Sequence, residues 1–277
     1  MTDISSADIG SGVSGTHSSD VTASHAGFLR DLISVATRAL RQIPREPEAI
    51  ILALIIPIFF FVVNVGALGD IAGQTGVDDF KAFQLPVAIV FAVTGISRAS
   101  ALVTDITGGY FDRLLLTPIN RLALLLGLMI ADFALVVALS VPVLILGFIV
   151  GVEFTTGIVG LLIFLLLAGA WGLAFTGFPY AIALKTGNPA AVNSSFILFF
   201  PFAFLTTTFL PQEALTGWLS TIADYNPVTY LLEALRSLIS EGWVASSLLK
   251  GLAAIGIVGS ISFTFAMTAL KGRVSRG

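Results

Sequence analysis

The chain has 277 residues, of which 56% are hydrophobic and 11% are charged, and its mean hydropathy is +0.97. Soluble domains average about 45–50% apolar and about 25% charged residues, so the composition excludes an ordinary soluble protein. The absence of cysteine excludes disulfides, thiolate metal sites and a cysteine nucleophile. Several apolar runs reach the roughly 20 residues that a membrane-spanning helix needs, and alternating strand patterns do not occur. We therefore predict an all-α integral membrane protein.

The N-terminal segment differs in composition from the rest of the chain. It is rich in Ser, Thr and Gly, contains no Lys or Arg, and holds no apolar run long enough for a signal-peptide core. We predict a disordered tail over residues 1–27 and a membrane domain over residues 28–277.

An amphipathic pattern follows the tail. Between residues 28 and 43, apolar residues share one helical face and basic or hydroxyl residues share the other. The apolar set is Leu29, Leu32, Ile33, Ala36, Leu40 and Ile43, and the polar set is Arg30, Ser34, Thr37, Arg38 and Arg41. Because Pro44 ends the pattern, we predict a helix that lies on the membrane surface.

Six apolar runs predict six transmembrane helices. Their expected bounds are residues 49–69, 84–104, 122–151, 157–184, 194–210 and 247–270. The prolines inside these runs include Pro57, Pro142, Pro179 and Pro201. Neighbouring helices can satisfy the carbonyl groups that a proline leaves without a donor, so we expect kinks at these positions.

The Lys and Arg residues are distributed unevenly between the two sides of the predicted membrane. With a cytoplasmic N-terminus, ten of the 14 lie on the cytoplasmic side: Arg30, Arg38, Arg41, Arg45, Arg113, Arg121, Lys185, Lys271, Arg273 and Arg276. Lys81, Arg236 and Lys250 fall outside, and Arg98 lies within a span. The positive-inside rule therefore places both termini in the cytoplasm of a multi-pass protein of the cell membrane.

The link between the fifth and sixth spans contains a further apolar helix pattern. Asn226 and Pro227 form a favourable helix start, and the apolar stripe that follows extends over only about 14 residues, too few to cross a membrane. We predict a short re-entrant or interfacial helix on the outer side. Residues 211–223 would supply its hairpin partner, with Trp218 and Trp243 as interfacial anchors.

The sequence contains no recognised catalytic or nucleotide-binding motif. A G-x-x-x-x-G-K-[ST] phosphate loop, an H-E-x-x-H metal motif and a G-x-S-x-G nucleophile motif are all absent, and His17 and His25 lie in the tail. We predict no catalytic, cofactor or metal site in this chain, and hence no enzyme activity of its own.

Two ionisable residues lie within the predicted spans. Burying a lone charge in lipid costs several kcal/mol, so Arg98 and Asp132 are candidates for function. An ion pair between the second and third spans is one interpretation. The alternative is that each residue reaches water near the cytoplasmic mouth and serves only assembly.

The predicted fifth span is rich in phenylalanine. Phe196, Phe200 and Phe204 are candidates to line a path for an apolar substrate. The alternative is that these rings face lipid and pack against neighbouring helices.

A short charged segment, residues 105–121, separates the second and third spans. It reads DITGGYFDRLLLTPINR and falls on the cytoplasmic side. The segment and the span after it resemble ABC type-2 exporter permeases, especially the daunorubicin-resistance permease group of actinobacteria, in which a G-[FY]-x-[DE]-R-[LM]-x-x-[TS]-P-[VI]-[SN]-R pattern is typical. Residues 193–238, with NSSFILFFPFAFLTTTFLP, GWL and NPVTYLLEALRSL, resemble the same family's fifth span and outer hairpin.

The resemblance covers roughly residues 28–270 and implies a permease that pairs with a separate ATPase. In such an exporter two permeases, identical or different, combine with two ATPase subunits, and ATP and magnesium bind to the ATPase. The segment would hold the coupling helix that docks on the ATPase, with contributions from Gly109, Tyr110, Phe111, Asp112, Arg113, Leu114, Leu115, Thr117, Pro118 and Arg121. An ordinary positively charged inside loop is the alternative.

We therefore predict the permease subunit of an ATP-driven exporter that works by alternating access in the lipid bilayer, with no nucleic-acid partner. The expected cargo is a hydrophobic or amphipathic small molecule, such as a drug, an antibiotic or a lipid-like compound. Three alternatives stay open: a permease for polysaccharide or glycolipid export, a proton-driven secondary transporter that uses Asp132 and Arg98, and a membrane scaffold or receptor subunit without transport. The absence of an internal repeat counts against the second.

Overall fold

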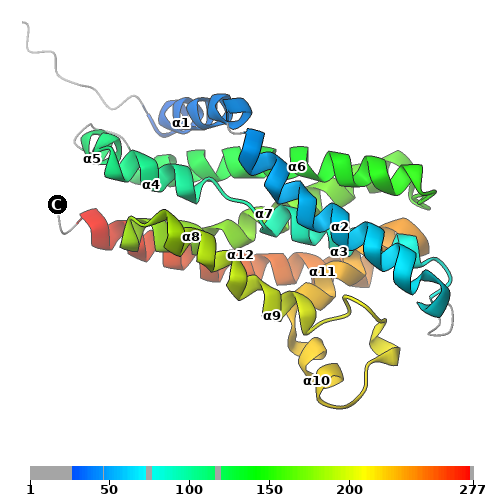
Figure 1. Cartoon of the computed structure of the whole chain (residues 1–277). Coiled ribbons are helices and arrows are strands. Elements are labelled where there is room, and N and C mark those ends of the chain that lie inside the picture. The colour runs from blue at the N-terminus through cyan, green and yellow to red at the C-terminus, as the bar shows by residue number, and fades with distance from the viewer. Residues whose placement is uncertain (1–26, 46, 73–76, 116–119, 275–277) are drawn as a thin grey trace, which may run out of the picture.

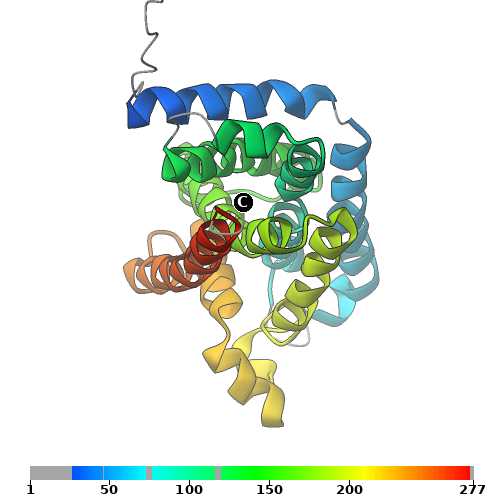
Figure 2. The ribbon, with the colours of Figure 1, turned by 90° about the vertical axis from the view of Figure 1, so that its left-hand side faces the viewer.

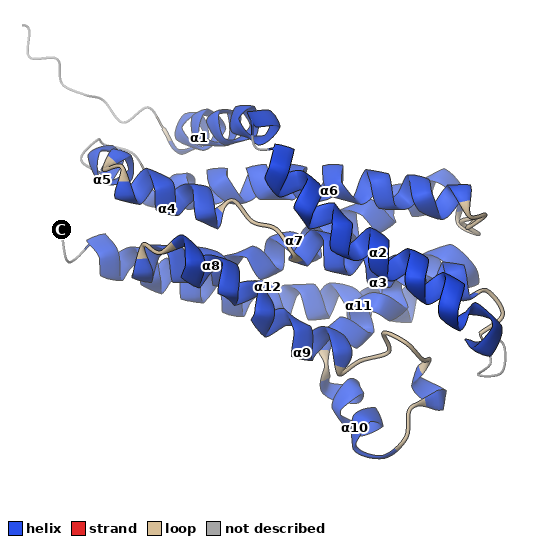
Figure 3. Ribbon diagram, in the orientation of Figure 1, coloured by secondary structure: helices blue, strands red, loops and turns tan. Residues whose placement is uncertain are grey.

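A computed structural model describes residues 27–45, 47–72, 77–115 and 120–274. Every regular element in these ranges is helical, as Figure 3 shows, and the predicted α class is confirmed. The predicted tail lies outside the described residues, apart from Gly27.

The helices follow one another in the order predicted. They are α1 (Phe28–Gln42), α2 (Pro47–Ala72), α3 (Phe80–Thr94), α4 (Ala99–Thr107), α5 (Tyr110–Leu115), α6 (Arg121–Ile149), α7 (Gly157–Thr186), α8 (Pro189–Ser195), α9 (Phe199–Phe204), α10 (Gly217–Tyr225), α11 (Pro227–Arg236) and α12 (Ala245–Val274). Short 3-10 turns at Ile43–Arg45, Phe196–Leu198 and Gln212–Ala214 and a π-helical turn at Ser237–Glu241 lie between them.

Five stretches in the described part of the chain are long and apolar enough to cross a membrane. They are Ile50–Gly69, Phe80–Thr107, Leu122–Ile149, Gly157–Thr186 and Ala245–Arg273. They match five of the six predicted spans, and the chain is a multi-pass membrane protein.

The predicted span at residues 194–210 is not one continuous helix. It is divided among α8, a 3-10 turn and α9. The ring of Pro201 crowds the carbonyl of Ile197, four residues earlier, which accounts for the irregular turn there. After Phe204 the Thr208 hydroxyl donates to the Ala203 carbonyl, a side-chain bond that competes with continuation of the helix.

The second span is also interrupted, between α3 and α4. The break contains Gly95, which ends α3, and Ser97, whose hydroxyl accepts the Ala99 N–H at 3.1 Å. Hydrogen-bonding side chains of this kind offer the backbone an alternative to the helix. Gly95 and Ser97 therefore contribute locally to the break, although the run of apolar residues predicted an uninterrupted span.

The long helices run together as a bundle, and α1 crosses it at one end, roughly perpendicular to the others (Figures 1 and 2). Close packing of α1 on α6 depends on Gly127, because a Cβ there would lie 2.8 Å from Val35 Cβ. The α5 turn and the C-terminal end of α12 lie at the same end of the bundle as α1 (Figure 1).

Two apolar cores hold the bundle together. One centres on α3, α7 and α11 and buries residues such as Ile89, Trp171 and Leu235. The other lies at the α5 end and buries residues such as Leu102 and Phe111. The second core fixes the position of the charged segment predicted to have a function.

Candidate functional site

The segment that follows the second span folds as a tight helix–turn–helix. α4 ends at Thr107, and Gly109 adopts φ +70, a left-handed conformation that favours glycine. Helix α5 then begins at Tyr110 and ends at Leu115. Two consecutive glycines thus reverse the chain within one turn of leaving the span.

Helix α1 holds this segment in place. The Arg38 guanidinium donates to both carboxylate oxygens of Asp105 at 3.2 and 3.0 Å, and its Cζ lies 4.0 Å from the centre of the Tyr110 ring. One residue of α1 therefore contacts α4 and α5 together. A second bond from α1 reaches the start of α6, where Asp31 accepts the main-chain N–H of Asn120 at 3.1 Å.

The two faces of α5 differ. Phe111 is 2% exposed and packs into the core of this end of the bundle, with the Arg273 guanidinium carbon 5.9 Å from its ring centre. Leu114 packs against the same core. Tyr110 is 41% exposed, and Arg113 is also exposed. Tyr110 and Arg113 are therefore available to a partner, whereas Phe111 anchors the helix.

The remaining predicted coupling residues are only partly described. Gly109 sits at the turn. Asp112, Leu115 and Arg121 have a described backbone but no described side chain, and Thr117 and Pro118 lie outside the described residues. Asn120, which the sequence analysis did not include, caps α6 by accepting the Leu122 N–H at 2.9 Å.

Arg98 and Asp132 do meet, at the break in the second span. Asp132 is completely buried, and it accepts the main-chain N–H of Arg98 at 2.8 Å and the Ser97 hydroxyl at 3.3 Å. The Arg98 guanidinium donates to Gln42 Oε1 at 2.9 Å, at the end of α1. The carboxylate thus accepts hydrogen bonds from the interrupted backbone, and the guanidinium connects the break to α1.

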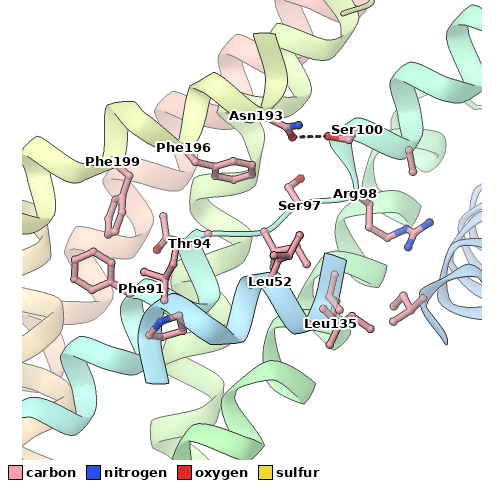
Figure 4. A pocket seen from close by; sticks show the side chains of 18 of the residues that line it. Leu52, Phe91, Thr94, Ser97, Arg98, Ser100, Leu135, Asn193, Phe196 and Phe199 are labelled. Atoms are coloured by element: carbon pink, nitrogen blue, oxygen red, sulfur yellow. Dashed lines mark hydrogen bonds between the residues drawn. The ribbon is translucent and has the colours of Figure 1, made fainter. Parts of the chain in front are cut away.

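A cavity of about 490 Å³ adjoins this break. α2 supplies an apolar wall that includes Leu52 and Pro57, α3 contributes Phe91 and Thr94, and the break contributes its backbone and side chains. Figure 4 shows the rings of Phe196 and Phe199 at one end of the cavity and the Arg98 side chain at the other.

The three phenylalanines predicted to line a substrate path lie in different surroundings. Phe196 and Phe200 line the cavity. Phe204 instead packs its ring against other rings, those of Phe60, Phe91, Phe200 and Phe209, with centroids 5.6 to 6.3 Å apart. The sequence analysis missed the polar lining at Ser97, Ser100 and Asn193, which a Gly–Ile–Ser–Arg interruption in an apolar span could have indicated.

Arg236 forms a second cluster that the sequence analysis missed. It is 8% exposed and donates to the Thr207 hydroxyl, the Thr207 carbonyl and the Phe83 carbonyl at 2.9, 2.7 and 3.1 Å. Its Cζ also lies 3.5 Å from the centre of the Phe83 ring. Arg236 therefore links α11, the Thr206–Thr208 run and α3.

These features define a class: a multi-pass helical membrane protein with an interrupted second span, a cavity at the interruption and a clamped helical turn at one end. Comparison with known families identifies the family. The model of the ABC-2 type transporter family matches residues 30–240, and the chain belongs to that family.

Individual relatives agree with this assignment. The chain is 28% identical over 206 residues to the daunorubicin resistance ABC transporter permease protein DrrB1 of Streptomyces coeruleorubidus, which covers 73% of this chain and 72% of the relative. It is 24% identical over 224 residues to the probable doxorubicin resistance ABC transporter permease protein DrrC of Mycobacterium tuberculosis, covering 80% and 81%. It is 27% identical over 232 residues to the putative transport permease ycf38 of Cyanophora paradoxa, covering 79% and 78%.

Proposed function

We propose that this chain is the membrane subunit of an ATP-driven exporter of hydrophobic or amphipathic small molecules. Two copies, or one copy and a related permease, would combine with two soluble ATPase subunits that bind ATP and magnesium. The family and the names of the relatives support this function. The observation that carries it is the α4–α5 turn, which presents Tyr110 and Arg113 outward while Phe111 anchors it in the core.

This turn is suited to transmit force. An ATPase that pulls on Tyr110 and Arg113 pulls on a helix whose opposite face is buried, so the displacement passes to α4 and the core rather than being absorbed by a flexible loop. The Arg38 contacts with Asp105 and Tyr110 add α1 to the moving unit. Asp112, Leu115, Thr117, Pro118 and Arg121 complete the proposed coupling segment.

The proposal includes a sixth crossing and an outer re-entrant hairpin. In Figure 1 α8 starts at the α5 end of the bundle, and α9 leads the chain toward the opposite end, where α12 begins. The path from α8 to α9 would therefore cross the membrane, and α10 with α11 would turn back within its outer half. Both termini are then cytoplasmic, which agrees with the distribution of Lys and Arg.

The cavity at the interrupted span is the proposed cargo site. Its volume of about 490 Å³ lies within the range of about 300–1,000 Å³ for small-molecule sites. Phe196 and Phe200 would contact the apolar part of the cargo. Movement of α4 by the ATPase would change this site directly, because α4 begins at Ala99, immediately after Arg98, which lines the cavity.

The proton-driven alternative receives less support. Asp132 does not line the cavity, and its carboxylate is engaged with the Arg98 N–H and the Ser97 hydroxyl. A structural role at the break accounts for its burial. No observation favours a polysaccharide over a smaller cargo.

The test is assembly with an ATPase. Co-expression with the cognate ABC ATPase subunit should yield a complex with vanadate-sensitive ATP hydrolysis in proteoliposomes. Arg113→Glu reverses an exposed charge on α5 and should reduce copurified ATPase severalfold. Arg30→Glu, an equal charge change at an exposed site on α1, is the matched control. A stable Arg113→Glu complex with normal coupling of hydrolysis to transport would remove the main support for this assignment.

A further inference from the structure

The exposed surface of α1 is divided lengthwise into an apolar strip and a basic strip. At about 100° per residue, Leu29, Ile33 and Leu40 fall within about 40° of one another, and all three are exposed. The exposed Arg30 and Arg41 occupy the neighbouring arc and lie within about 20° of one another. The apolar strip and the basic strip therefore run side by side along the helix.

Close packing holds these strips at a fixed angle to the bundle. A Cβ at Gly127 of α6 would lie 2.8 Å from Val35 Cβ, so the two helices are in close contact. Ala36 and Ala39, on the same side of α1, are 7% and 2% exposed. Rotation of α1 about its own axis would disrupt this packing, and the exposed strips therefore keep their direction.

The basic strip lies at the level where the spans end. α1 crosses one end of the bundle roughly perpendicular to the long helices, so it runs along the plane of the membrane (Figure 2). Around the helix, the apolar strip is followed by the basic strip and then by Arg38, which contacts the α4–α5 turn at that end of the bundle. The basic strip thus lies between acyl chains and water, which is the position of lipid headgroups.

The charges of the basic strip have no partner in the described part of the chain. The ion pair that α1 forms there joins Arg38 to Asp105, and neither Arg30 nor Arg41 has one. Asp31, the carboxylate within α1, accepts a main-chain N–H at the start of α6. The two exposed guanidinium groups therefore present positive charge to whatever lies against the apolar strip.

We propose that the basic strip of α1 binds anionic phospholipid headgroups of the leaflet in which the helix lies. A guanidinium can donate two parallel hydrogen bonds to a phosphate. The phosphate of a zwitterionic lipid carries an ammonium group of its own, which opposes this attraction. Arg30 and Arg41 are about 16 Å apart along the axis, so each would contact a separate lipid. Lipid binding here goes beyond the export function and does not depend on it.

Ser34 offers a position for a reporter of the lipids at this strip. It is exposed, and it lies one helical turn after Arg30 on the same side of α1. The chain contains no cysteine, so Ser34→Cys creates a single site for a small uncharged fluorophore. A nitroxide quenches such a fluorophore at short range, and the signal therefore reports lipids next to the basic strip.

The experiment compares two lipids that carry the same nitroxide on the acyl chain and differ in the headgroup. Nitroxide-labelled phosphatidylglycerol or phosphatidylcholine is added in increasing fractions to phosphatidylcholine nanodiscs that contain the labelled full-length chain. An arginine near an anionic membrane surface contributes about 1 kcal/mol. We therefore expect half-quenching at about fivefold lower fractions of phosphatidylglycerol. The preference should shrink in about 1 M salt, because salt screens exposed charges.

Paired substitutions locate the preference on α1. Arg30→Gln/Arg41→Gln should bring the two lipids to nearly equal quenching. Arg30→Lys/Arg41→Lys keeps both charges and should retain most of the preference. Lys185→Gln/Lys271→Gln is the matched control, because it removes the same charge from exposed positions near the ends of α7 and α12. It should leave the preference unchanged.

Equal quenching by the two lipids in the unsubstituted labelled chain would overturn the inference. So would a full preference in Arg30→Gln/Arg41→Gln, or an equal loss in Lys185→Gln/Lys271→Gln, which would assign the preference to net charge. In pure phosphatidylcholine, single substitutions at Arg30 or Arg41 should leave ATPase assembly and coupling unchanged. A loss of ATPase binding there would show that the basic strip binds the ATPase and not lipid. The quenching uses the permease alone, so a failure to assemble with any ATPase would overturn the export function and leave lipid binding intact.

Discussion

The buried Asp132 carboxylate accepts hydrogen bonds at the break between α3 and α4. Its two carboxylate oxygens accept a main-chain N–H and a hydroxyl at a point where a spanning helix is interrupted. An interruption in a membrane leaves N–H groups without helical partners, and each costs several kcal/mol in hydrocarbon. The carboxylate therefore stabilises an irregular backbone that the cavity requires.

This role predicts a difference between two substitutions at the same position. Asp132→Ala leaves the Arg98 N–H without its acceptor and should lower the free energy of unfolding by about 1–3 kcal/mol. Asp132→Asn keeps an amide oxygen and should lose clearly less. Thermal unfolding in detergent measures both. Equal losses would show that the negative charge, rather than the hydrogen bond, is what the site needs.

Arg38 is the residue through which α1 contacts the coupling segment. Its side chain is 38% exposed and that of Asp105 is 24% exposed, so the ion pair contributes about 0.2–1 kcal/mol to stability. Arg38→Glu should therefore leave folding nearly intact while loosening the α4–α5 turn. We expect the number of ATP molecules hydrolysed per molecule transported to rise severalfold in proteoliposomes containing the ATPase.

The charge swap Arg38→Glu/Asp105→Arg separates positioning from charge. It restores the ion pair but not the stacking of Arg38 on Tyr110, so it should recover coupling in part. Arg41→Glu, an exposed change on the same helix, is the control for altered surface charge. The positioning role would be refuted if the swap coupled no better than Arg38→Glu alone.

At the scale of the element, the close contact between α7 and α12 depends on the absence of a side chain. A Cβ at Gly177 would lie 2.5 Å from the main-chain carbon of Ser262, nearer than real Cβ atoms approach, and the obstacle is backbone that cannot rotate away. The Ser262 hydroxyl also donates to the Ala174 carbonyl at this crossing. In membranes, such small-residue contacts drive helix association.

Gly177→Ala should therefore destabilise the bundle although alanine favours helices. We expect a loss of about 1–3 kcal/mol, the usual cost of overpacking, measured by thermal unfolding in detergent. Gly256→Ala, in α12, is the matched control, because a Cβ there meets nothing within 4 Å. A Gly177→Ala protein as stable as the control would mean that α7 and α12 can separate without cost.

The sequence predicted most elements because each had a strong local signal. Length and hydropathy identified α2, α6, α7 and α12, and Asn226 followed by Pro227 identified the start of α11. The break at residues 95–98 was missed because it depends on Asp132, a residue far along the chain that accepts the freed N–H. Hydropathy averages over such a short interruption.

The candidate coupling site was also predictable only where its residues carry a local signal in the sequence. The α5 turn has its own local signal in the two glycines and the charged helix that follows. The role of Phe111 was not predictable, because its burial depends on residues of α4, α6 and α12 that meet only in the folded bundle. The sequence analysis used Arg38 and Arg236 only to count positive charges on each side of the membrane. Their hydrogen-bond partners Asp105 and Thr207 lie 67 and 29 residues away along the chain, so no local pattern connects them.

At the scale of the whole molecule, the surface of α1 indicates where the membrane boundary lies. Leu29, Ile33 and Leu40 are exposed and form one arc of the helix, while the exposed Arg30 and Arg41 form the next. The remaining arc packs on α6 through residues such as Val35. α1 therefore has one side that packs against protein, one exposed apolar side and one exposed basic side. Such a helix is suited to the interface between lipid and water.

If α1 marks the membrane boundary, the proposed six-span topology can be tested by cysteine labelling. The chain contains no cysteine, so a single introduced cysteine reports its own side of the membrane. The exposed positions chosen are Lys185 near the end of α7, Thr216 before α10 and Ser246 at the start of α12. If α8 and α9 together cross the membrane, Thr216→Cys and Ser246→Cys should react with a membrane-impermeant maleimide in intact cells, and Lys185→Cys only after lysis. Reaction of Lys185→Cys and Thr216→Cys under the same condition would show that the chain does not cross between them, and the six-span arrangement would be wrong.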